Sequence, residues 1–100
     1  MENTSIKLND TNSFDIDGFS RNTTIQDGKL ISNAYVTLKN PGSAVIENLR
    51  SIALQPITEI ALIHNEETIY SLTELTARIT SIDESLNDDG KIRCTFYIYF

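Results

Sequence analysis

Two residue types that carry acid–base or nucleophilic chemistry at neutral pH occur once each in this sequence of 100 residues, as His64 and Cys94. His64 stands beside Asn65 and two glutamates, a composition typical of a solvated turn rather than of a general base. Cys94 belongs to the apolar face of a strand pattern, where a thiol behaves as a small hydrophobic group. The sequence therefore predicts no catalytic residue, and we expect no enzyme.

Two Asp-rich stretches, DIDG at 15–18 and NDDG at 87–90, resemble the middle of a calcium-binding loop. The acidic residue that such a loop needs at its twelfth position is absent from both, because Thr24 and Phe96 stand there. One His and one Cys do not make a zinc site, and there is no Gly-rich phosphate loop. We interpret both stretches as turns and expect neither a metal ion nor a cofactor.

The charge balance bears on the class of partner. Fourteen acidic and eight basic residues give a net charge of −6, and the basic residues are scattered along the chain. Because this charge repels phosphate groups, we expect neither nucleic acid nor an anionic membrane as a partner. No stretch approaches the roughly 18 apolar residues of a membrane span, and the first residues lack the pattern of a signal peptide. The sequence predicts a protein made and folded in a reducing cytoplasm.

Apolar residues are sparse in the first quarter of the chain and denser after it. SIKL and SFDI predict two short strands there, but such a segment cannot bury enough surface to order itself. It must lie either on its own domain or on a neighbouring molecule, and both alternatives stay open. We therefore predict an extended N-terminal arm over residues 1–28 and a single β-rich domain over residues 29–100.

The stretch at 40–56, NPGSAVIENLRSIALQP, allows two interpretations. Pro41-Gly42 is compatible with a hairpin turn before another strand, but the alternation that follows is poor. On a helix, the apolar residues gather on one side. Asn40 suits an N-cap, Pro41 the first helical position and Pro56 the end. We predict one α-helix around residues 41–54 with this apolar side: Val45, Ile46, Leu49, Ile52 and Ala53.

The rest of the domain has a β pattern. LISNAYVTLK at 30–39 follows a turn signal and alternates between two faces. ITEIALI at 57–63, TIYSLT and LTARITSIDESL at 75–86 predict three more strands, the last with a bulge near Ser81. Gly90 ends a strong turn signal before the final strand. The predicted fold is mainly β (α+β), an antiparallel β-sandwich or small barrel of about six or seven strands with one helix.

The final strand, KIRCTFYIYF at 91–100, is apolar and aromatic on both faces. Cys94, Phe96 and Ile98 share a face that we assign to the core. The other face could pair with neighbouring strands through residues such as Arg78 or Thr80, or it could be a subunit interface. In either case the strand should be central or covered. With two aromatic residues of the N-terminal segment, the candidate interface residues are Arg93, Thr95, Tyr97, Tyr99, Phe14 and Phe19.

The C-terminal third, TIYSLTELTARITSIDESLNDDGKIRCTFYIYF, resembles small virion proteins of tailed bacteriophages in its texture. Those proteins include decoration, connector, tail and baseplate components, and are commonly acidic, rich in Asn, Thr and Ile, and built from antiparallel β structure with a helix. The resemblance implies assembly into a symmetric particle, in which an arm can lie over a neighbouring subunit, and it implies a location in the virion.

We therefore expect a non-enzymatic structural subunit that acts through protein–protein contacts and self-associates in a symmetric assembly. Two alternatives stay open. The first is a small cytoplasmic adaptor or inhibitor that binds one host protein through the same face. The second is a β module that binds a small ligand or a carbohydrate, which would require an aromatic-lined groove with Tyr35 and Tyr70 as further candidates.

Overall fold

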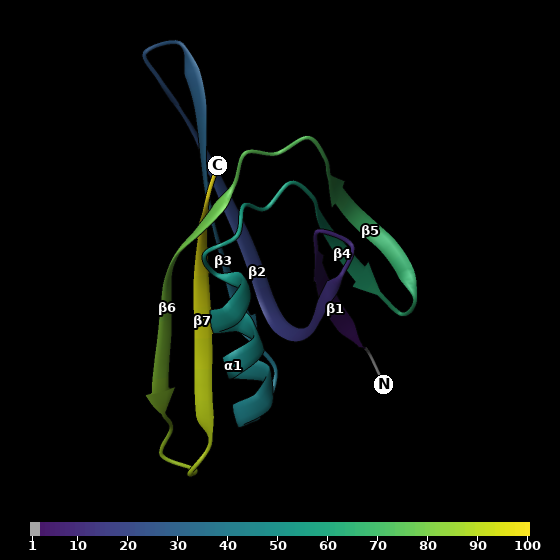
Figure 1. Ribbon diagram of the computed structural model, residues 1–100, viewed down its shortest axis with the longest axis vertical. Coiled ribbons are helices and arrows are strands. Elements are labelled where there is room, and N and C mark those ends of the chain that lie inside the picture. Colours follow the sequence, from purple (N-terminus) through teal and green to yellow (C-terminus); the bar gives the residue numbers. More distant parts are fainter. Residues whose placement is uncertain (1–2) are drawn as a thin grey trace.

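An antiparallel sheet and a short helix make up the computed structural model, which describes residues 3–100 (Figure 1). Over this range the sheet has seven strands in the order β5-β4-β1-β2-β3-β7-β6. The fold is therefore mainly β with one helix, as the sequence predicts. The elements are β1 (Thr4–Leu8), β2 (Asn12–Gln26), β3 (Lys29–Leu38), α1 (Ser43–Ile52), β4 (Ile60–His64), β5 (Glu67–Leu72), β6 (Arg78–Leu86) and β7 (Ile92–Tyr99).

The long strand β2 joins the two parts of the sheet. It pairs with β1 up to Asp15 and with β3 from Ile16 onward, and the register shifts between Ile16 and Gly18. An extra residue in one strand bends it and increases its twist. The prediction of a turn at DIDG is wrong, because residues 15–18 belong to β2. The bend at this point lets a single sheet curve around the core (Figure 1).

A backbone bridge ties the two parts of the sheet together at a second point. Ile57, just before β4, exchanges two hydrogen bonds with Ala77, just before β6, at N···O distances of 2.8 and 3.0 Å. Because Ile57 makes only this isolated bridge, β4 begins at Ile60 rather than at the predicted residue 57.

The N-terminal residues are an integral part of this sheet rather than an arm. β1 lies between β4 and β2, and Ile6 and Leu8 are buried. A division at residue 28 would cut the β2–β3 hairpin at its turn. Few apolar side chains suffice here because β1 also gains backbone hydrogen bonds on both sides. Of the two positions left open for this segment, the structure shows packing on its own domain.

Helix α1 covers the inner face of the sheet, as Figure 1 shows. Ile46, Leu49 and Ile52 are buried, and their spacing places them on one side of the helix. The predicted N-terminus is wrong in detail: the N-cap is Gly42, without a side-chain hydrogen bond. Asn40 instead has a positive φ of 43° and turns the chain out of β3.

Both outermost strands of the sheet contain a bulge. In β5 the register against β4 shifts around Ile69, and in β6 the register against β7 shifts around Thr80. The second shift confirms the bulge predicted near Ser81, and the predicted turn at Gly90 is confirmed by its φ of +81°. Bulges twist an edge away from further pairing, so both free edges of the sheet are poor templates for an added strand.

One core connects the helix with both parts of the sheet. The rings of Phe14 and Phe96 meet edge to face inside it, with their centroids 6.4 Å apart. The buried core residues are Ile6, Leu8, Phe14, Ile16, Ala34, Val36, Leu38, Ile46, Leu49, Ile52, Ile57, Ile60, Leu62, Ala77, Cys94, Phe96 and Ile98.

Candidate functional site

The aromatic strand β7 is central, between β3 and β6, as expected for a strand that is apolar on both faces. On its inner face Cys94, Phe96 and Ile98 are at most 1% exposed. On its outer face Tyr97 and Tyr99 remain 37% and 48% exposed. The inner face is therefore used by the fold, and the outer face is accessible.

Strand β3 contributes a third aromatic residue to this outer surface. The register places Tyr35 directly opposite Tyr97, and their ring centroids are 6.4 Å apart with an angle of 47° between the planes. Tyr35 is 48% exposed. We call this surface the tyrosine face, and it consists of Tyr35, Tyr97 and Tyr99 with the neighbouring polar residues Ser20, Asn22, Asn33, Thr37, Ser81 and Thr95.

No residue of the tyrosine face is charged, although 22% of the chain is. Charged residues directly adjoin it on β6 and β7: Arg78 stands opposite Tyr99, Asp83 opposite Thr95, and Arg93 opposite Ser85. The centres of protein–protein interfaces are depleted of charge and enriched in tyrosine, and their rims are polar. The tyrosine face has this composition.

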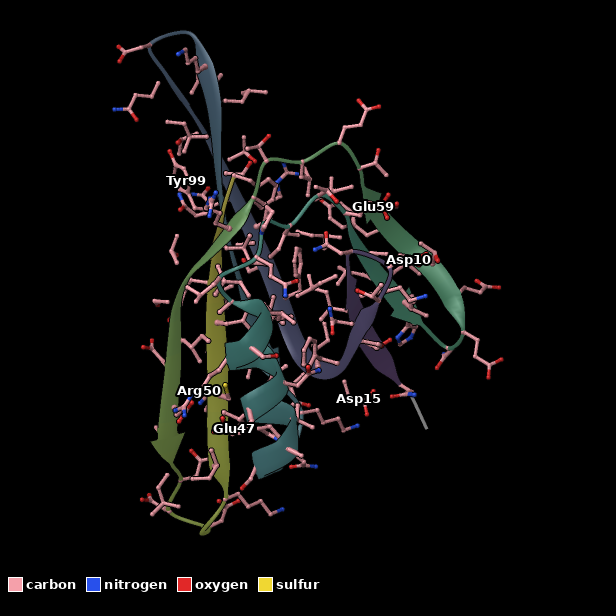
Figure 2. The ribbon with its side chains drawn as sticks, in the orientation of Figure 1. Asp10, Asp15, Glu47, Arg50, Glu59 and Tyr99 are labelled. Carbon is pink, nitrogen blue, oxygen red and sulfur yellow. The ribbon has the colours of Figure 1, made fainter. Side chains whose placement is uncertain are left out.

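Cross-strand pairing, the first of the alternatives considered for the outer face of this strand, holds for part of the tyrosine face. Tyr99 pairs with Arg78, as considered from the sequence, whereas the bulge places Ser81 rather than Thr80 opposite Tyr97. On the other side, Thr95 pairs with Thr37, and their hydroxyl oxygens are 3.3 Å apart. In Figure 2, Tyr99 lies at the base of the projecting β2–β3 hairpin. Cross-strand contacts thus order the tyrosines without hiding them.

The two phenylalanines predicted at the interface lie elsewhere. Phe14 is 3% exposed and belongs to the core rather than to the tyrosine face. Phe19 is half-buried on the inner side of β2 and packs against Tyr70, with centroids 5.9 Å apart. The interface residues predicted from the sequence do not include Tyr35. Its position on the outer face follows from the alternation in residues 30–39, but its pairing with Tyr97 depends on the register of distant strands.

The two residues considered for catalysis, His64 and Cys94, lie on β4 and β7, which are not neighbours in the sheet. The Nδ1 atom of His64 lies 2.7 Å from the hydroxyl of Thr4, with which it shares a hydrogen bond across β1 and β4. Cys94 is fully buried, and burial raises the pKa of its thiol, with the charge of Glu84 acting in the same direction. Within residues 3–100 no group of His, Cys, Asp and Glu side chains could hold a metal ion.

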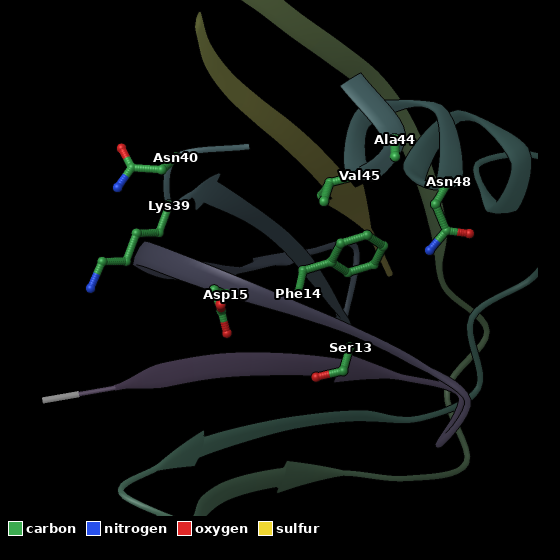
Figure 3. Close-up of a pocket in the computed structure, with 8 residues that line it drawn as sticks. All are labelled: Ser13, Phe14, Asp15, Lys39, Asn40, Ala44, Val45 and Asn48. Atoms are coloured by element: carbon green, nitrogen blue, oxygen red, sulfur yellow. The ribbon is translucent and has the colours of Figure 1, made fainter. Parts of the chain in front are cut away.

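An open hollow of about 340 Å³ lies between the start of β2 and the first turns of α1 (Figure 3). Phe14 and Val45 line its centre, and Asp15 and Lys39 lie along one side. The backbone N–H of Lys39 donates a hydrogen bond to the carbonyl oxygen of Asp15, at 2.9 Å, which ties the end of β3 to β2. Ser13, Asn40, Ala44 and Asn48 complete the lining of the hollow.

None of the helical structure in residues 3–100 is long and apolar enough to cross a membrane. Comparison of the sequence with protein-family models and with curated proteins finds no match. The tyrosine face is therefore the feature of this fold on which an interpretation of function depends.

Proposed function

We propose that this chain is a non-enzymatic subunit of a protein assembly and binds other subunits through the tyrosine face. The observation that carries the proposal is the tyrosine face itself, three partly exposed tyrosines among uncharged polar side chains with charged residues at its border, in a chain with a net charge of −6. Tyrosines supply a large apolar area together with a hydroxyl that can form hydrogen bonds across an interface.

The surface lies on the ordered part of the sheet. Its tyrosines stand on β3 and β7, whose inner faces are held in the core, so little conformational freedom is lost when a partner covers them. The bulged outer strands disfavour association through the sheet edges. Contact through the face of the sheet is therefore the more favourable route.

A particle of a tailed bacteriophage is the setting that we propose for this assembly, as a capsid decoration, connector, tail or baseplate component. Support for that setting comes from the resemblance of residues 68–100 to small virion proteins. In a symmetric particle the same surface is buried in every copy, which makes a modest interface effective.

Carbohydrate binding is less well supported by the geometry. A sugar ring stacks on flat aromatic surfaces, and neighbouring rings should then share a plane. The rings of Tyr35 and Tyr97 are inclined by 47° to one another, and Tyr70 lies away from them against Phe19. The aromatic residues therefore do not form a common stacking surface.

The double variant Tyr35→Ser/Tyr97→Ser tests the proposal by light scattering after size exclusion over a range of concentrations. We expect the wild type to exceed the 11.2 kDa of one chain as its concentration rises, and the variant to stay near that mass. Ile69→Ser is the matched control, because Ile69 is 59% exposed and lies on the outermost strand β5. Equal association of wild type and double variant would contradict the proposal.

The adaptor alternative predicts a different result. An adaptor would stay monomeric and form a complex of fixed ratio with one foreign protein, and that complex would be lost in Tyr35→Ser/Tyr97→Ser. Mass measurement of complexes isolated with the wild-type chain distinguishes the two functions. A complex with one host protein and no further copies or virion subunits would replace the proposed function by the adaptor.

A further inference from the structure

The inner face of the sheet continues past the core at both ends of the molecule. At one end Ile25 and Leu30 form a cross-strand pair of β2 and β3, and they are 77% and 72% exposed. At the other end Leu86 and Ile92 form a cross-strand pair of β6 and β7, and they are 70% and 43% exposed. Because side chains alternate between faces, both pairs lie on the side of the sheet that bears α1.

The first pair belongs to a projecting element that we call the hairpin tip, residues 22–31. The paired strands on either side stop short of it, since β1 pairs with β2 up to Asp15 and β7 pairs with β3 from Asn33. Figure 1 shows this hairpin extending beyond the rest of the molecule. A two-stranded hairpin alone is marginally stable in water, so contact with a partner would stabilise the tip.

Arg21 fixes the base of the hairpin tip. Its guanidinium donates hydrogen bonds to the hydroxyls of Ser32 and Tyr70, and it lies 4.7 Å from the centroid of the Phe100 ring. The hairpin therefore leaves the body in a defined direction. A docking element with a fixed direction loses less entropy on binding than a flexible one.

The second pair borders a hollow of about 400 Å³ between α1 and β6, which we call the acceptor hollow. Ile46, Leu86 and Ile92 supply its apolar lining. Glu47, Arg50 and Glu84 supply its polar side, and one Nη atom of Arg50 donates hydrogen bonds of 2.7 and 2.9 Å to the two carboxylate oxygens of Glu84. The hollow is open and wide enough to receive aliphatic side chains.

Charge differs between the two ends of the molecule. The hairpin tip itself is neutral, with Lys29 and Asp27, and Arg21 at its base adds one positive charge. Around the β6–β7 turn, residues 82–93 contain four acidic and two basic residues. A chain that repels itself overall thus has a slightly basic end and an acidic end, which favours contact between unlike ends.

The hairpin of one chain does not reach the acceptor hollow of the same chain. The molecule is 45 Å long, and Figure 1 shows the hairpin tip and the β6–β7 turn at opposite ends of this axis. An intramolecular contact is therefore excluded, and the charge difference between the two ends favours another copy as the occupant. We propose that Ile25 and Leu30 of one copy dock in the acceptor hollow of a second copy, head to tail; this inference rests on the proposed function as an assembly subunit.

Such a contact joins two different surfaces, so it leads to a ring or to a filament rather than to a closed dimer. Two aliphatic side chains bury much less than the roughly 800 Å² per partner of a standard interface. The contact is therefore weak on its own, and it gains strength where the tyrosine face is also covered or where a ring closes.

Sedimentation velocity of charge-insertion variants tests the contact. Ile25→Asp/Leu30→Asp removes the docking tip, and Leu86→Asp blocks the hollow. We expect each to weaken self-association by at least about tenfold, because a carboxylate would be buried against apolar side chains. Thr24→Asp is the matched control, since Thr24 lies on the other face of the same hairpin, and it should associate like the wild type. Circular dichroism checks that all variants are folded.

A mixture of the two defective variants gives the sharper result. The Leu86→Asp chain keeps its tip and the Ile25→Asp/Leu30→Asp chain keeps its hollow, so an equimolar mixture should associate more strongly than either variant alone at the same total concentration. A mixture that associates no more strongly than the separate variants, or a monomeric wild type at all concentrations, would overturn the inference. If association depends on Tyr35 and Tyr97 but not on Ile25, Leu30 or Leu86, this contact is refuted while the proposed function stands.

Discussion

The two faces of the β3–β7 strand pair use the same backbone for different purposes. On the inner face Val36 pairs with Phe96, and both are 0% exposed. In the adjacent cross-strand pair, Tyr35 lies opposite Tyr97 on the outer face. Tyr35 is 48% exposed and Tyr97 is 37% exposed. Aromatic content alone therefore does not assign both faces of a strand to the core. The inner face is covered by the core, whereas the outer face is open to solvent.

This comparison separates stability from association. Inner-face residues should determine the free energy of unfolding, and outer-face residues should determine what the protein binds. The separation holds because the tyrosines contribute to the fold chiefly through one cross-strand pair, whereas the inner residues fill the connected core.

The largest effect should come from Phe96→Ala. Its ring is fully buried in the core beside Phe14, so truncation leaves a cavity and should cost about 3–5 kcal/mol of unfolding free energy. Tyr97→Ala, one residue along the same strand, should cost only about 1 kcal/mol, since it loses a half-exposed aromatic pair. Urea unfolding followed by circular dichroism measures both, and equal losses would contradict the separation of the faces.

A smaller loss of stability should follow Cys94→Ser. Cys94 is buried between apolar side chains, so a hydroxyl in its place would cost about 1–3 kcal/mol if it found no hydrogen-bond partner. Thr95→Ser on the outer face is the control, and it should change the unfolding free energy by less than about 0.5 kcal/mol. A serine variant as stable as the wild type would show that the hydroxyl finds a hydrogen-bond partner at this inner position.

The same thiol predicts a dependence of stability on pH. In the folded protein the pKa of Cys94 is raised by burial first and by Glu84 next, with Arg50 opposing them. The unfolded chain therefore ionises this thiol at lower pH, near its ordinary pKa of about 8.5. The contribution of the neutral, buried Cys94 thiol to the unfolding free energy is complete below that unfolded-state pKa. It is lost as the pH rises through the folded-state pKa.

We accordingly expect the unfolding free energy of the wild type to fall more steeply from pH 8 to pH 10 than that of Cys94→Ala. Urea unfolding at both pH values measures the two slopes, and the variant cancels the contributions of the tyrosines and lysines. Parallel slopes would mean that the Cys94 thiolate is as favourable in the fold as in the unfolded chain.

The smallest effect should come from the ion pair beside the acceptor hollow. Arg50 and Glu84 are in contact at 2.7 Å, but their side chains are 53% and 30% exposed, and water screens them. Glu84→Gln should cost about 0.2–1 kcal/mol at low salt and less at high salt. Thermal unfolding at both ionic strengths measures it, with Asp88→Gln as a control for lost charge in the exposed turn. A loss above that range, independent of salt, would assign the pair to the core.

Local patterns in the sequence predict much of this fold. The alternation of Ala34, Val36 and Leu38, the single apolar side of residues 45–53 and the turn at Gly90 all depend on near neighbours, and the structure agrees with them. The mainly β class follows from those patterns.

The features that local patterns missed depend on distant partners. Residues 4–16 look too polar to fold alone, but β1 gains hydrogen bonds from β2 and β4, and β4 lies far along the chain. Phe14 is in the core for the same reason. The tyrosine face likewise requires the register of β3 against β7, which places Tyr35 beside Tyr97 and which no short stretch of sequence specifies.

Photocrosslinking from the tyrosine face is the most direct test of its role in assembly. A photoreactive phenylalanine analogue replaces Tyr97 in one protein and Leu54, which is 89% exposed at the end of α1, in a control. We predict that position 97 crosslinks to further copies of the chain or to another subunit in fixed ratio, and that position 54 does not. Crosslinking from position 97 no greater than from position 54, in cells in which the protein has assembled, would contradict the account.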